Sequence, residues 1–332
     1  MYEELGRERL RTGEWLRVGV VEGPDAEWLP RVAPFLGHKP DQYRHHIRAA
    51  LEGPLEGLET RFYVGTVDER LISQVMVVGD RRVGILGHVF TRPEERRKGA
   101  CATILQHQMD HSRRLGYRAL CLGTGFDSHP YHLYRRFGFQ GVAPGNGCMR
   151  WLATSTVEEE IFAPGETDVR DGRWEDWAYG FLLSVRPVWP DEELPRNVTL
   201  GVRTQSSTEG AFLQFQRRRE REPGLQLKVL VSAAGTPVGW AMLAPDLRWF
   251  REHWLLDVDV HPAFLDHLPK LIAALAWPEA EVVSYSTDPA GPQSRALRQA
   301  GFRMEESPAE WLTLPAGRGA VYRWRLDGTT AG

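Results

Sequence analysis

One order of elements occurs twice along this chain of 332 residues. In each occurrence, two strands joined by a short turn precede a third strand that ends before a proline. A helix, a short strand and a second helix follow. The nine residues SRALRQAGF from Ser294 align without a gap on YHLYRRFGF from Tyr131. Such repetition is typical of two copies of one fold. It predicts an α/β (α+β) chain of two tandem domains, each with a mixed, mostly antiparallel sheet flanked by helices.

Hydrophobic periodicity and turn residues predict the individual elements of both copies. In the first copy, the predicted strands are 15–22, 61–67, 71–78, 83–91, 119–123, 139–142 and 148–152, and the predicted helices are 24–35, 41–51, 99–115 and 129–137. In the second copy, the predicted strands are 228–232, 238–243, 254–260 and 281–285, and the predicted helices are 263–276 and one that ends at Gly301.

A turn-rich, acidic stretch, residues 154–172, separates the two copies. It has little periodicity, which is typical of a linker. The predicted division is therefore a first domain of residues 1–156 and a second of residues 157–332, which agrees with about 150 residues per domain. Basic residues exceed acidic ones by four in residues 1–155, and acidic residues exceed basic ones by seven in the remainder. A basic first domain suits an anionic ligand.

Composition and motif searches exclude several classes of protein. No run of 18 apolar residues occurs and the first sixteen residues are highly charged, so we expect a cytoplasmic protein with no membrane partner. The three cysteines are odd in number and lack metal-ligand spacing, so no disulfide framework and no metal are expected. The basic run 217–221 lies in the acidic half, so no nucleic-acid partner is expected.

The stretch with the most specific chemistry is FTRPEERRKGACATIL, residues 90–105, where a strand end and a basic loop lead to a glycine that opens a helix. The start of a helix leaves several N–H groups unpaired and carries partial positive charge, so it binds phosphate. Gly99 allows close approach of a ligand, and the small residues 100–102 leave the amides uncovered. Four cations flank this predicted polyphosphate loop: Arg92, Arg96, Arg97 and Lys98.

The motif Pro93-x-x-Arg96-x-x-Gly99-x-Cys101 resembles the pyrophosphate-binding loop of GNAT superfamily acyltransferases. Cys101 stands where the family has glycine or alanine, but it is nearly as small. Tyr134, four residues before a Gly-Phe pair, and Asp127 resemble the second motif of the family, in which asparagine is usual at the Asp127 position. The resemblance covers residues 15–155 in order and the second half more faintly.

The resemblance implies a GNAT-like fold for both domains and acetyl-CoA, or another acyl-CoA, as co-substrate. Loop amides would hold the pyrophosphate, and the backbone of the preceding strand would pair with the pantetheine arm. The acceptor amine would attack the thioester directly, with backbone donors holding the oxyanion where strands 83–91 and 119–123 splay apart. Tyr134 would protonate the departing thiolate as general acid. The implied cofactor-binding residues are Val89, Phe90, Thr91, Arg96, Arg97, Lys98, Gly99, Ala100, Cys101 and Asp127.

The general base is less well defined than the acid. Histone-modifying members of the family carry a glutamate about eight positions before the loop proline, where this chain has Ile85, so a protein-lysine substrate is disfavoured. His88, on the same strand, has a side chain whose ordinary pKa suits a base. His88 is either a second catalytic residue or a strand histidine paired with a neighbour. Tyr134 is likewise either the acid or a packed aromatic.

The second copy lacks the residues of both motifs. Alignment of Pro262 on Pro93 puts Leu268 where Gly99 stands, and the later motif puts Leu297 where Tyr134 stands. We therefore expect a degenerate second domain with no acyl transfer of its own and a structural or acceptor-pocket role.

The predicted function is N-acetylation of a small-molecule amine by a monomer or homodimer. Acidic side chains of the second half would attract a cationic amine such as a polyamine. Two alternatives are a CoA-binding sensor or scaffold without turnover, and a tandem GNAT resembling peptidyltransferases that take aminoacyl-tRNA. The acidic second half argues against the RNA-binding surface that the latter needs.

Overall fold

The structure, a computed structural model, describes residues 1–185, 208–246, 253–286, 288–305, 312–314, 317–319 and 322–328. Its contacts divide the chain into two compact units. The first unit contains residues 1–157, 173–185 and 212–214, and the second contains the other described residues. Each unit therefore includes segments from more than one part of the sequence.

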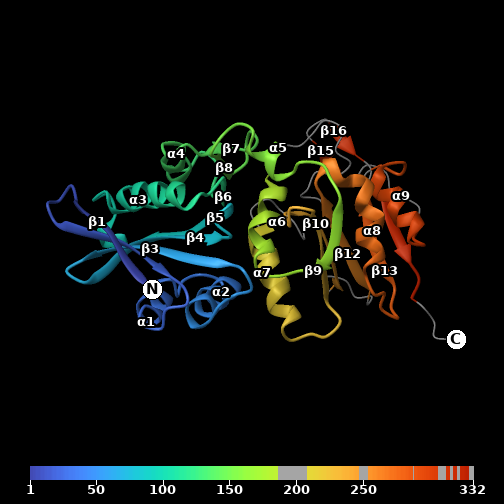
Figure 1. Cartoon of the computed structure of the whole chain (residues 1–332), viewed down its shortest axis with the longest axis horizontal. Coiled ribbons are helices and arrows are strands. Elements are labelled where there is room, and N and C mark those ends of the chain that lie inside the picture. Colours follow the sequence, from blue (N-terminus) through green and yellow to red (C-terminus); the bar gives the residue numbers. More distant parts are fainter. Residues whose placement is uncertain are drawn as a thin grey trace. The chain divides into compact units, whose positions relative to one another are not determined.

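The first unit is built on a sheet of eight strands (Figure 1). Their bounds are β1 (Tyr2–Arg9), β2 (Trp15–Glu22), β3 (Glu59–Val67), β4 (Arg70–Gly79), β5 (Val83–Thr91), β6 (Ala119–Gly123), β7 (Gln140–Gly141) and β8 (Cys148–Leu152). In space the order is β1-β2-β3-β4-β5-β6-β8-β7, and every pair is antiparallel except β5 with β6. Strands β3 and β4 are buried along nearly their whole length, as expected for a sheet covered on both faces.

Helices cover both faces of this sheet: α1 (Leu29–Phe35), α2 (Asp41–Glu52), α3 (Ala100–Leu115), α4 (His129–Arg135) and α6 (Asp176–Ser184). Helix α3 lies across strands β1 to β5, and α1 and α2 lie on the opposite side (Figure 1). The buried face of α3 contains the four residues that its periodicity placed together: Ile104, Leu105, Gln108 and Met109. Both ends of α3 are marked by glycines with left-handed backbone, Gly99 at φ +102° and Gly116 at φ +90°.

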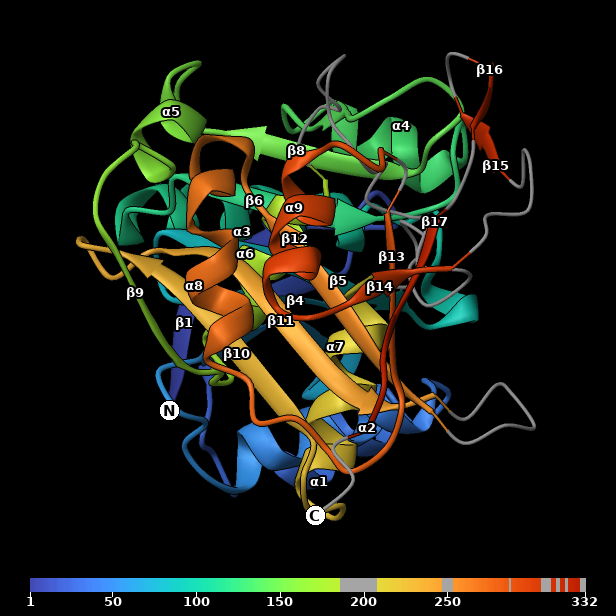
Figure 2. The same cartoon turned by 90° about the vertical axis from the view of Figure 1, so that its right-hand side faces the viewer.

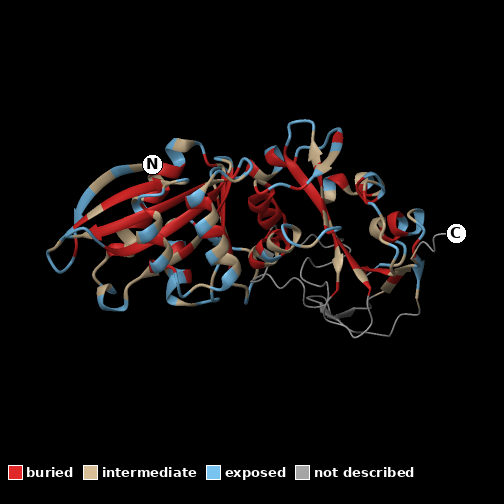
Figure 3. Ribbon diagram, turned by 90° about the horizontal axis from the view of Figure 1, so that it is seen from below, coloured by how far each residue is buried: buried red, intermediate tan, exposed pale blue. Residues whose placement is uncertain are grey.

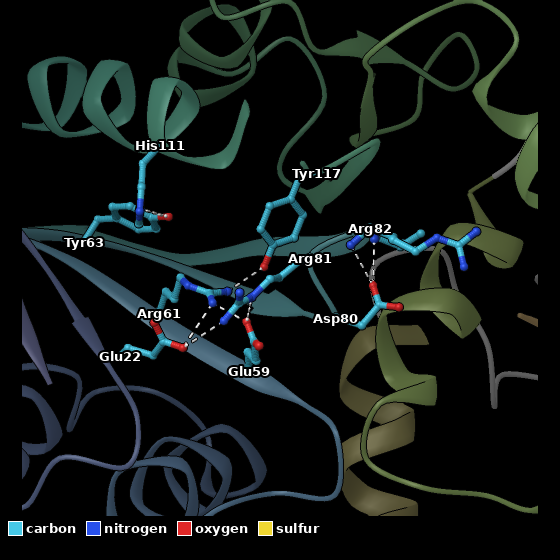
Figure 4. A network of polar contacts seen from close by, with 10 residues as sticks. Glu22, Glu59, Arg61, Tyr63, Asp80, Arg81, Arg82, His111 and Tyr117 are labelled. Atoms are coloured by element: carbon cyan, nitrogen blue, oxygen red, sulfur yellow. Dashed lines mark hydrogen bonds and ion pairs between the residues drawn. The ribbon is translucent and has the colours of Figure 1, made fainter. Parts of the chain in front are cut away.

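A buried arginine ties strands β2 and β3 to the turns at one end of the sheet (Figure 4). The fully buried Arg61 guanidinium donates to the hydroxyl of Tyr117 and to the carboxylate of Glu22, both at 3.1 Å. Glu59 is its second carboxylate partner and also accepts from Arg81 Nε at 2.7 Å. Two carboxylates thus balance two guanidiniums, which offsets the cost of removing Arg61 from water.

Helix α6 is buried over its whole length (Figure 3). It packs on β4, β5 and β6. The hydroxyl of Tyr179 donates to Asp80 at 2.7 Å, and Asp80 also caps the β4–β5 turn through two backbone amides (Figure 4). The fully buried ring of Trp177 lies 4.8 Å from that of His46 on α2. These contacts place α6 in the first unit, although it lies beyond residue 156, and the division at that residue stays a proposal.

The second unit contains a sheet of seven strands, a separate two-stranded sheet and short helices among its described residues. The bounds are α5 (Val157–Ile161), β9 (Thr167–Asp171), α7 (Thr208–Arg219), β10 (Gln226–Ser232), β11 (Pro237–Pro245), β12 (Trp254–Val260), the 3-10 helix η2 (Pro262–His267), α8 (Leu268–Ala273), β13 (Val282–Ser286), α9 (Pro292–Gln299), β14 (Arg303–Met304), β15 (Leu312–Leu314), β16 (Gly317–Gly319) and β17 (Tyr322–Leu326). Helices α8 and α9 lie side by side on one face of the larger sheet (Figure 2).

The two large sheets share one strand order. The order β2-β3-β4-β5-β6-β8-β7 in the first corresponds to β9-β10-β11-β12-β13-β17-β14 in the second. The one parallel pair, β5 with β6 or β12 with β13, occupies the same place in both. The predicted fold class, two mixed and mostly antiparallel sheets flanked by helices, is confirmed.

Some elements differ from the sequence-based expectations. The helix predicted at 263–276 is wrong as a single element, because η2 covers its first part and α8 begins only at Leu268. Pro269 lies at the start of α8, where its missing N–H costs nothing. Other elements were not predicted at all: strands β1, β9, β14, β15, β16 and β17 and helices α5, α6 and α7.

The described residues contain neither a membrane-spanning helix nor a cluster of metal ligands. None of their helices combines the length and the apolar character needed to cross a membrane. No cluster of three or more histidine, cysteine or acidic side chains within them is arranged to hold a metal ion.

Candidate functional site

A cavity of about 530 Å³ opens in the first unit where the end of β5 meets the starts of α3 and α4. We call it the β5–α3 cavity, and its lining residues are Arg11, Val89, Phe90, Thr91, Glu95, Arg96, Arg97, Gly99, Ala100, Cys101, Ala102, His129, Pro130, Leu133, Tyr134 and Arg136. Eight of the ten residues predicted to bind the cofactor are among them, together with Tyr134. The chain thus brings together two motifs that lie more than thirty residues apart in sequence.

Strands β5 and β6 part beside this cavity. They pair only through residues 83–85 of β5, so residues 86–91 have no strand partner on that side within the described structure. On the other side, the register of β4 and β5 shifts between Gln74 and Met76 and leaves one extra residue in β5. His88, in this bulge, has φ +49°, a left-handed conformation that is rare for a side chain of its size. The splayed strands implied by the resemblance are therefore present, with free backbone groups along β5.

The loop before α3 presents bare backbone amides to the cavity. The hydrogen bond from Thr103 N–H to the Gly99 carbonyl, at 3.1 Å, closes the first turn, so the amides of residues 100–102 precede the intrahelical ladder. A Cβ built on Gly99 would meet nothing nearer than Arg11 Cγ at 3.9 Å, so the space above it is open. Arg97 has left-handed backbone at φ +64°, which turns the loop into the helix. A helix start with open space above its amides fits a pyrophosphate.

Four guanidiniums line the β5–α3 cavity, those of Arg11, Arg96, Arg97 and Arg136. Arg11 comes from the β1–β2 turn, and its amide donates to the carbonyl of Lys98 at 3.0 Å. That hydrogen bond ties the turn to the loop. The cations are suited to a polyphosphate because Arg pairs with phosphate oxygens at fixed geometry.

Two cations predicted beside the loop have other partners. The Lys98 ammonium pairs with Glu14 at 3.2 Å and with Glu95 at 2.9 Å, and its side chain does not line the cavity. Arg92 donates from Nε to the Leu71 carbonyl at 2.8 Å and lines a different cavity. Lys98 therefore holds the loop through ion pairs, while its backbone carbonyl binds the β1–β2 turn.

Tyr134 projects from α4 into the cavity and is 6% exposed. Its ring packs against Phe139 with the centroids 6.1 Å apart. Burial raises the pKa of its hydroxyl above the ordinary value, and the neighbouring Cys101 thiol adds to the rise. Burial also raises the pKa of Cys101 to about 11. Both groups are neutral at pH 7, so Tyr134 keeps a proton to donate.

His88 does not line the β5–α3 cavity. Its ring lies 4.8 Å from that of Tyr43 on α2, and its buried Nε2 has no hydrogen-bond partner in the described structure. Burial, with smaller contributions from neighbouring Lys39 and histidines, holds the pKa of His88 well below its ordinary value, so the ring is neutral. Beside it, Gln74 Nε2 donates to the His88 carbonyl at 3.3 Å, and Gln74 Oε1 is also unpartnered. Two unpartnered polar atoms next to the bulge, His88 Nε2 and Gln74 Oε1, are available to a ligand or a water.

Asp127 lies outside the cavity lining. It has left-handed backbone at φ +55°, its side chain is 72% exposed, and its carboxylate is 3.0 Å from His132 Nε2. Its carboxylate contacts His132 of α4, the helix that follows it.

Sequence reasoning missed six lining residues, namely Arg11, Glu95, His129, Pro130, Leu133 and Arg136. The four on or next to α4 flank Tyr134 at intervals of one to five residues. The spacing of four residues along one helix face would have indicated Pro130 beside Tyr134. Arg11 had no local signal, because the β1–β2 turn reaches the loop only through tertiary structure.

A known family model matches the part of the chain that contributes most of the cavity lining. Residues 26–139, about a third of the chain, match the model of the family described as "Acetyltransferase (GNAT) family". Among curated proteins, a 3-phosphoshikimate 1-carboxyvinyltransferase of Thermus thermophilus is 25% identical over 197 residues. That match covers 57% of this chain and 42% of the relative, so the chain spans less than half of the relative's length.

Solved structures include acetyltransferases with low similarity. A putative acetyltransferase of Salmonella typhimurium, determined with acetyl-CoA, is 16% identical and covers 50% of this chain and 96% of its own, with a TM-score of 0.36. A probable N-acyltransferase of Enterococcus faecalis is 13% identical and covers 74% of this chain and 58% of its own, with a TM-score of 0.35. Likeness at this level carries no information on the substrate. The family match includes the strand, loop and helix that form the cavity, so this part of the chain is similar to the GNAT family of acetyltransferases.

Proposed function

We propose that the first unit transfers an acetyl group from acetyl-CoA, or a similar acyl group, to the amine of a small molecule. The observation that carries the proposal is the β5–α3 cavity, in which a parted strand, bare helix amides, four arginines and a buried tyrosine face one space. A phosphate-bearing thioester needs all four features. The second unit has a different helix start and takes no part in donor binding in this proposal.

The chain's own groups would hold the donor in three places. The amides at the start of α3 and the guanidiniums of Arg96, Arg97 and Arg11 would bind the pyrophosphate. The free edge of β5, residues 86–91, would pair with the amides of the pantetheine arm as an added strand does. The thioester would then lie near the bulge at His88, at the point where β5 and β6 part.

Acetyl-CoA supplies an acyl thioester as the electrophile. The amine nitrogen forms a bond to the thioester carbon, the carbon–sulfur bond breaks, and the thiol leaves with one proton. A backbone N–H of the parted segment would stabilise the carbonyl oxygen as it gains negative charge. Tyr134 would donate to the departing sulfur, because it is protonated and shares the cavity with the donor. Burial raises the pKa of Tyr134, and it would raise the pKa of the departing thiol as well. Proton transfer from the phenol to the sulfur therefore remains possible.

His88 is our candidate for the group that accepts the proton of the amine, directly or through a water. Its Nε2 is buried and unpartnered in the described structure, and its ring is neutral. Its position in the bulge puts the ring on the α2 side of the sheet, opposite Tyr134 on the α4 side. In this arrangement, the acid Tyr134 lies on the side where the thiol leaves, and the base His88 lies on the α2 side. An acceptor amine that enters from the α2 side would therefore meet the base first.

The proposal is tested by donor binding and turnover measured separately. Calorimetry with acetyl-CoA is expected to show binding, and release of free thiol is expected with at least one member of an amine panel. The variant Tyr134→Phe is expected to retain binding and to lose about 100-fold in turnover. The matched control is Tyr131→Phe on the same helix, which does not line the cavity and is expected to retain turnover. Binding without thiol release from any amine would favour the sensor or scaffold alternative, and absence of binding would refute the proposal.

A further inference from the structure

A second cavity lies next to the first, on the other side of β5. Its volume is about 620 Å³, and α1, the α1–α2 loop, β4 and the end of β5 form it. We call it the α1–β5 cavity, and the lining residues used below are Arg31, Phe35, His38, Phe90 and Arg92. Phe90 lines both cavities. Its ring packs 5.0 Å from Phe35 and 4.3 Å from His38, so the two cavities share one residue of the strand along which the donor would lie.

Two arginines of this cavity are held in place by contacts that leave their charge unpaired. Arg92 donates from Nε to the Leu71 carbonyl, and its guanidinium lies 5.1 Å from the ring centre of Phe35. Arg31 donates to the Glu69 carbonyl at 2.7 Å and lies 4.0 Å from the ring centre of Trp28. Stacking on an aromatic ring and one hydrogen bond to a carbonyl fix a guanidinium without neutralising it.

The nearby carboxylates are taken by other arginines. Glu94 and Glu95 pair with Arg70, and Glu69 pairs with Arg17. Within the described part of the chain, neither Arg31 nor Arg92 forms an ion pair. Burial and neighbouring Lys39 lower the pKa of His38, so the His38 ring is neutral at pH 7. The cavity therefore carries two permanent positive charges beside apolar rings.

We propose that the α1–β5 cavity binds the acid group of the acceptor, so that the acceptor is an amine that also carries a carboxylate or a phosphate. This inference rests on the proposed function, because it names the substrate class of the same site. Arg31 and Arg92 bind the anionic oxygens, and the rings of Phe35 and Phe90 contact the apolar part of the molecule. A dication such as a polyamine is disfavoured, because it would place a positive charge beside two guanidiniums.

The length of the strand gives the size of the acceptor. Arg92 lies four residues beyond His88, and an extended strand rises about 3.3 Å per residue, so the two backbone positions are about 13 Å apart. The arginine side chain covers part of this span, which leaves on the order of 10 Å between the acid group and the reacting amine. A molecule as short as glycine cannot span this distance. An aminoalkyl acid of six carbons or a short acidic peptide can.

A panel of equal length and different charge tests the proposal. The probes are 6-aminohexanoate, 6-aminohexyl phosphate, 6-amino-1-hexanol and 1,6-diaminohexane. We expect kcat/KM for the better anionic probe to exceed that for the alcohol at least tenfold, and we expect the diamine to rank last. In Arg92→Gln and Arg31→Gln, KM for the anionic probes should rise at least tenfold while KM for the alcohol and the Kd of acetyl-CoA stay unchanged. Arg48→Gln removes an exposed charge from α2 outside the cavity and serves as the matched control.

The outcomes separate this inference from the proposed function. Preference for the alcohol or the diamine, or an anion preference that survives in both arginine variants, would overturn the inference while leaving acetyl transfer intact. Failure of acetyl-CoA to bind would instead overturn the proposed function. Saturation-transfer NMR can measure the binding of 6-aminohexanoate to wild type and to Arg92→Gln in the presence of CoA. This measurement tests the inference even where no probe is turned over, and we expect a weaker signal in the variant. Equal signals in the two proteins would refute it.

Discussion

The two units share seven strands in one order but differ at the places where the first unit forms its cavity. The register of β4 and β5 shifts by one residue, whereas β11 and β12 pair without a shift over seven residues. The first unit continues from its proline into a helix of 16 residues that begins at a left-handed glycine. The second continues into η2 and then a helix of six residues. Where Tyr134 faces the cavity, the aligned Leu297 is fully buried on α9.

This difference separates the residues that specify the sheet from those that specify the site. Strand order follows from which faces are apolar, and both units keep that pattern. The site depends on a bulge, one glycine and one tyrosine, which can be lost without changing the strand order. In the second unit, a side chain caps the start of η2: His261 Nδ1 accepts a hydrogen bond from the amide of Ala263 at 3.2 Å. This amide is therefore not free to bind a ligand. A bare helix start was not kept there.

The two units do not correspond at helix α6. Among the predicted changes, disruption of α6 has the largest expected effect on stability. In sequence it lies between β9 and β10, as α1 lies between β2 and β3, yet it packs in the first unit. The variant Trp177→Ala leaves a large hole against β5 and α2 and is expected to lower the free energy of unfolding of the first unit by about 3–5 kcal/mol. Hydrogen exchange resolved by peptide measures this for each unit.

The matched control is Trp324→Ala in the second unit, which removes another fully buried tryptophan. Its Nε1 donates to Ser286 at 2.7 Å, so the loss there should appear in peptides of β13 and β17. If Trp177→Ala instead weakened only the second unit, the assignment of α6 to the first unit would be wrong.

Gly99 allows a direct test of the difference in helix starts. The variant Gly99→Glu places a carboxylate over the amides and strains a backbone at φ +102°, so the Kd of acetyl-CoA is expected to rise at least 100-fold, about 2.8 kcal/mol. Gly116→Glu makes the same change at the other end of α3, also at positive φ and with open space around it. It should cost similar stability and leave the Kd unchanged. Equal Kd values for Gly99→Glu and wild type by calorimetry would contradict the placement of the donor.

Acid is expected to weaken the first unit through buried His46. Burial lowers the pKa of His46 in the folded protein to about 3, whereas the unfolded chain binds a proton near the ordinary value of 6.5. The unfolded state therefore gains protons first, and stability that is fully present above pH 6.5 is lost as the pH falls toward 3. At pH 5 the expected loss is about 2 kcal/mol from this residue alone.

The variant His46→Phe keeps an aromatic ring beside Trp174 and Trp177 but cannot titrate. Hydrogen exchange of first-unit peptides, corrected for intrinsic rates, gives the free energy of unfolding at pH 7.5 and at pH 5. The decrease in this free energy between the two pH values should be about 2 kcal/mol smaller in the variant than in wild type. An undiminished difference would assign the acid sensitivity to other groups, of which His88 is the nearest buried histidine with a lowered pKa.

Local sequence predicted the elements that are bounded by turn residues. The ranges 83–91, 119–123, 148–152 and 254–260 agree with β5, β6, β8 and β12 at both ends. Strand β1 escaped prediction because its sequence YEELGRER is mostly charged, and it is defined by pairing with β2 rather than by an apolar face. Helix α6 is apolar on all sides, so it lacks the amphipathic pattern of a surface helix.

The candidate site shows the same limit. The loop from Arg96 to Cys101 was predictable because its chemistry lies in backbone amides next to each other in sequence. The direction of the Lys98 side chain was not predictable, because its ion-pair partner Glu14 lies on a turn that is distant in sequence. The α1–β5 cavity was not predictable from the sequence either, because Arg31 and Phe90 are distant in sequence and line one cavity only in the folded protein.

The smallest expected effect concerns the closed start of η2 in the second unit. The variant His261→Ala removes the side-chain acceptor of the Ala263 amide and the ring that stacks on Phe162 at 4.4 Å, and it should lower the stability of the second unit by about 1 kcal/mol. His261→Asn keeps an acceptor and should recover part of the loss. The Kd of acetyl-CoA should be the same in both variants as in wild type. An increased Kd in His261→Ala alone would mean that the second unit contributes to donor binding, and the contrast between a functional and a closed helix start would then no longer hold.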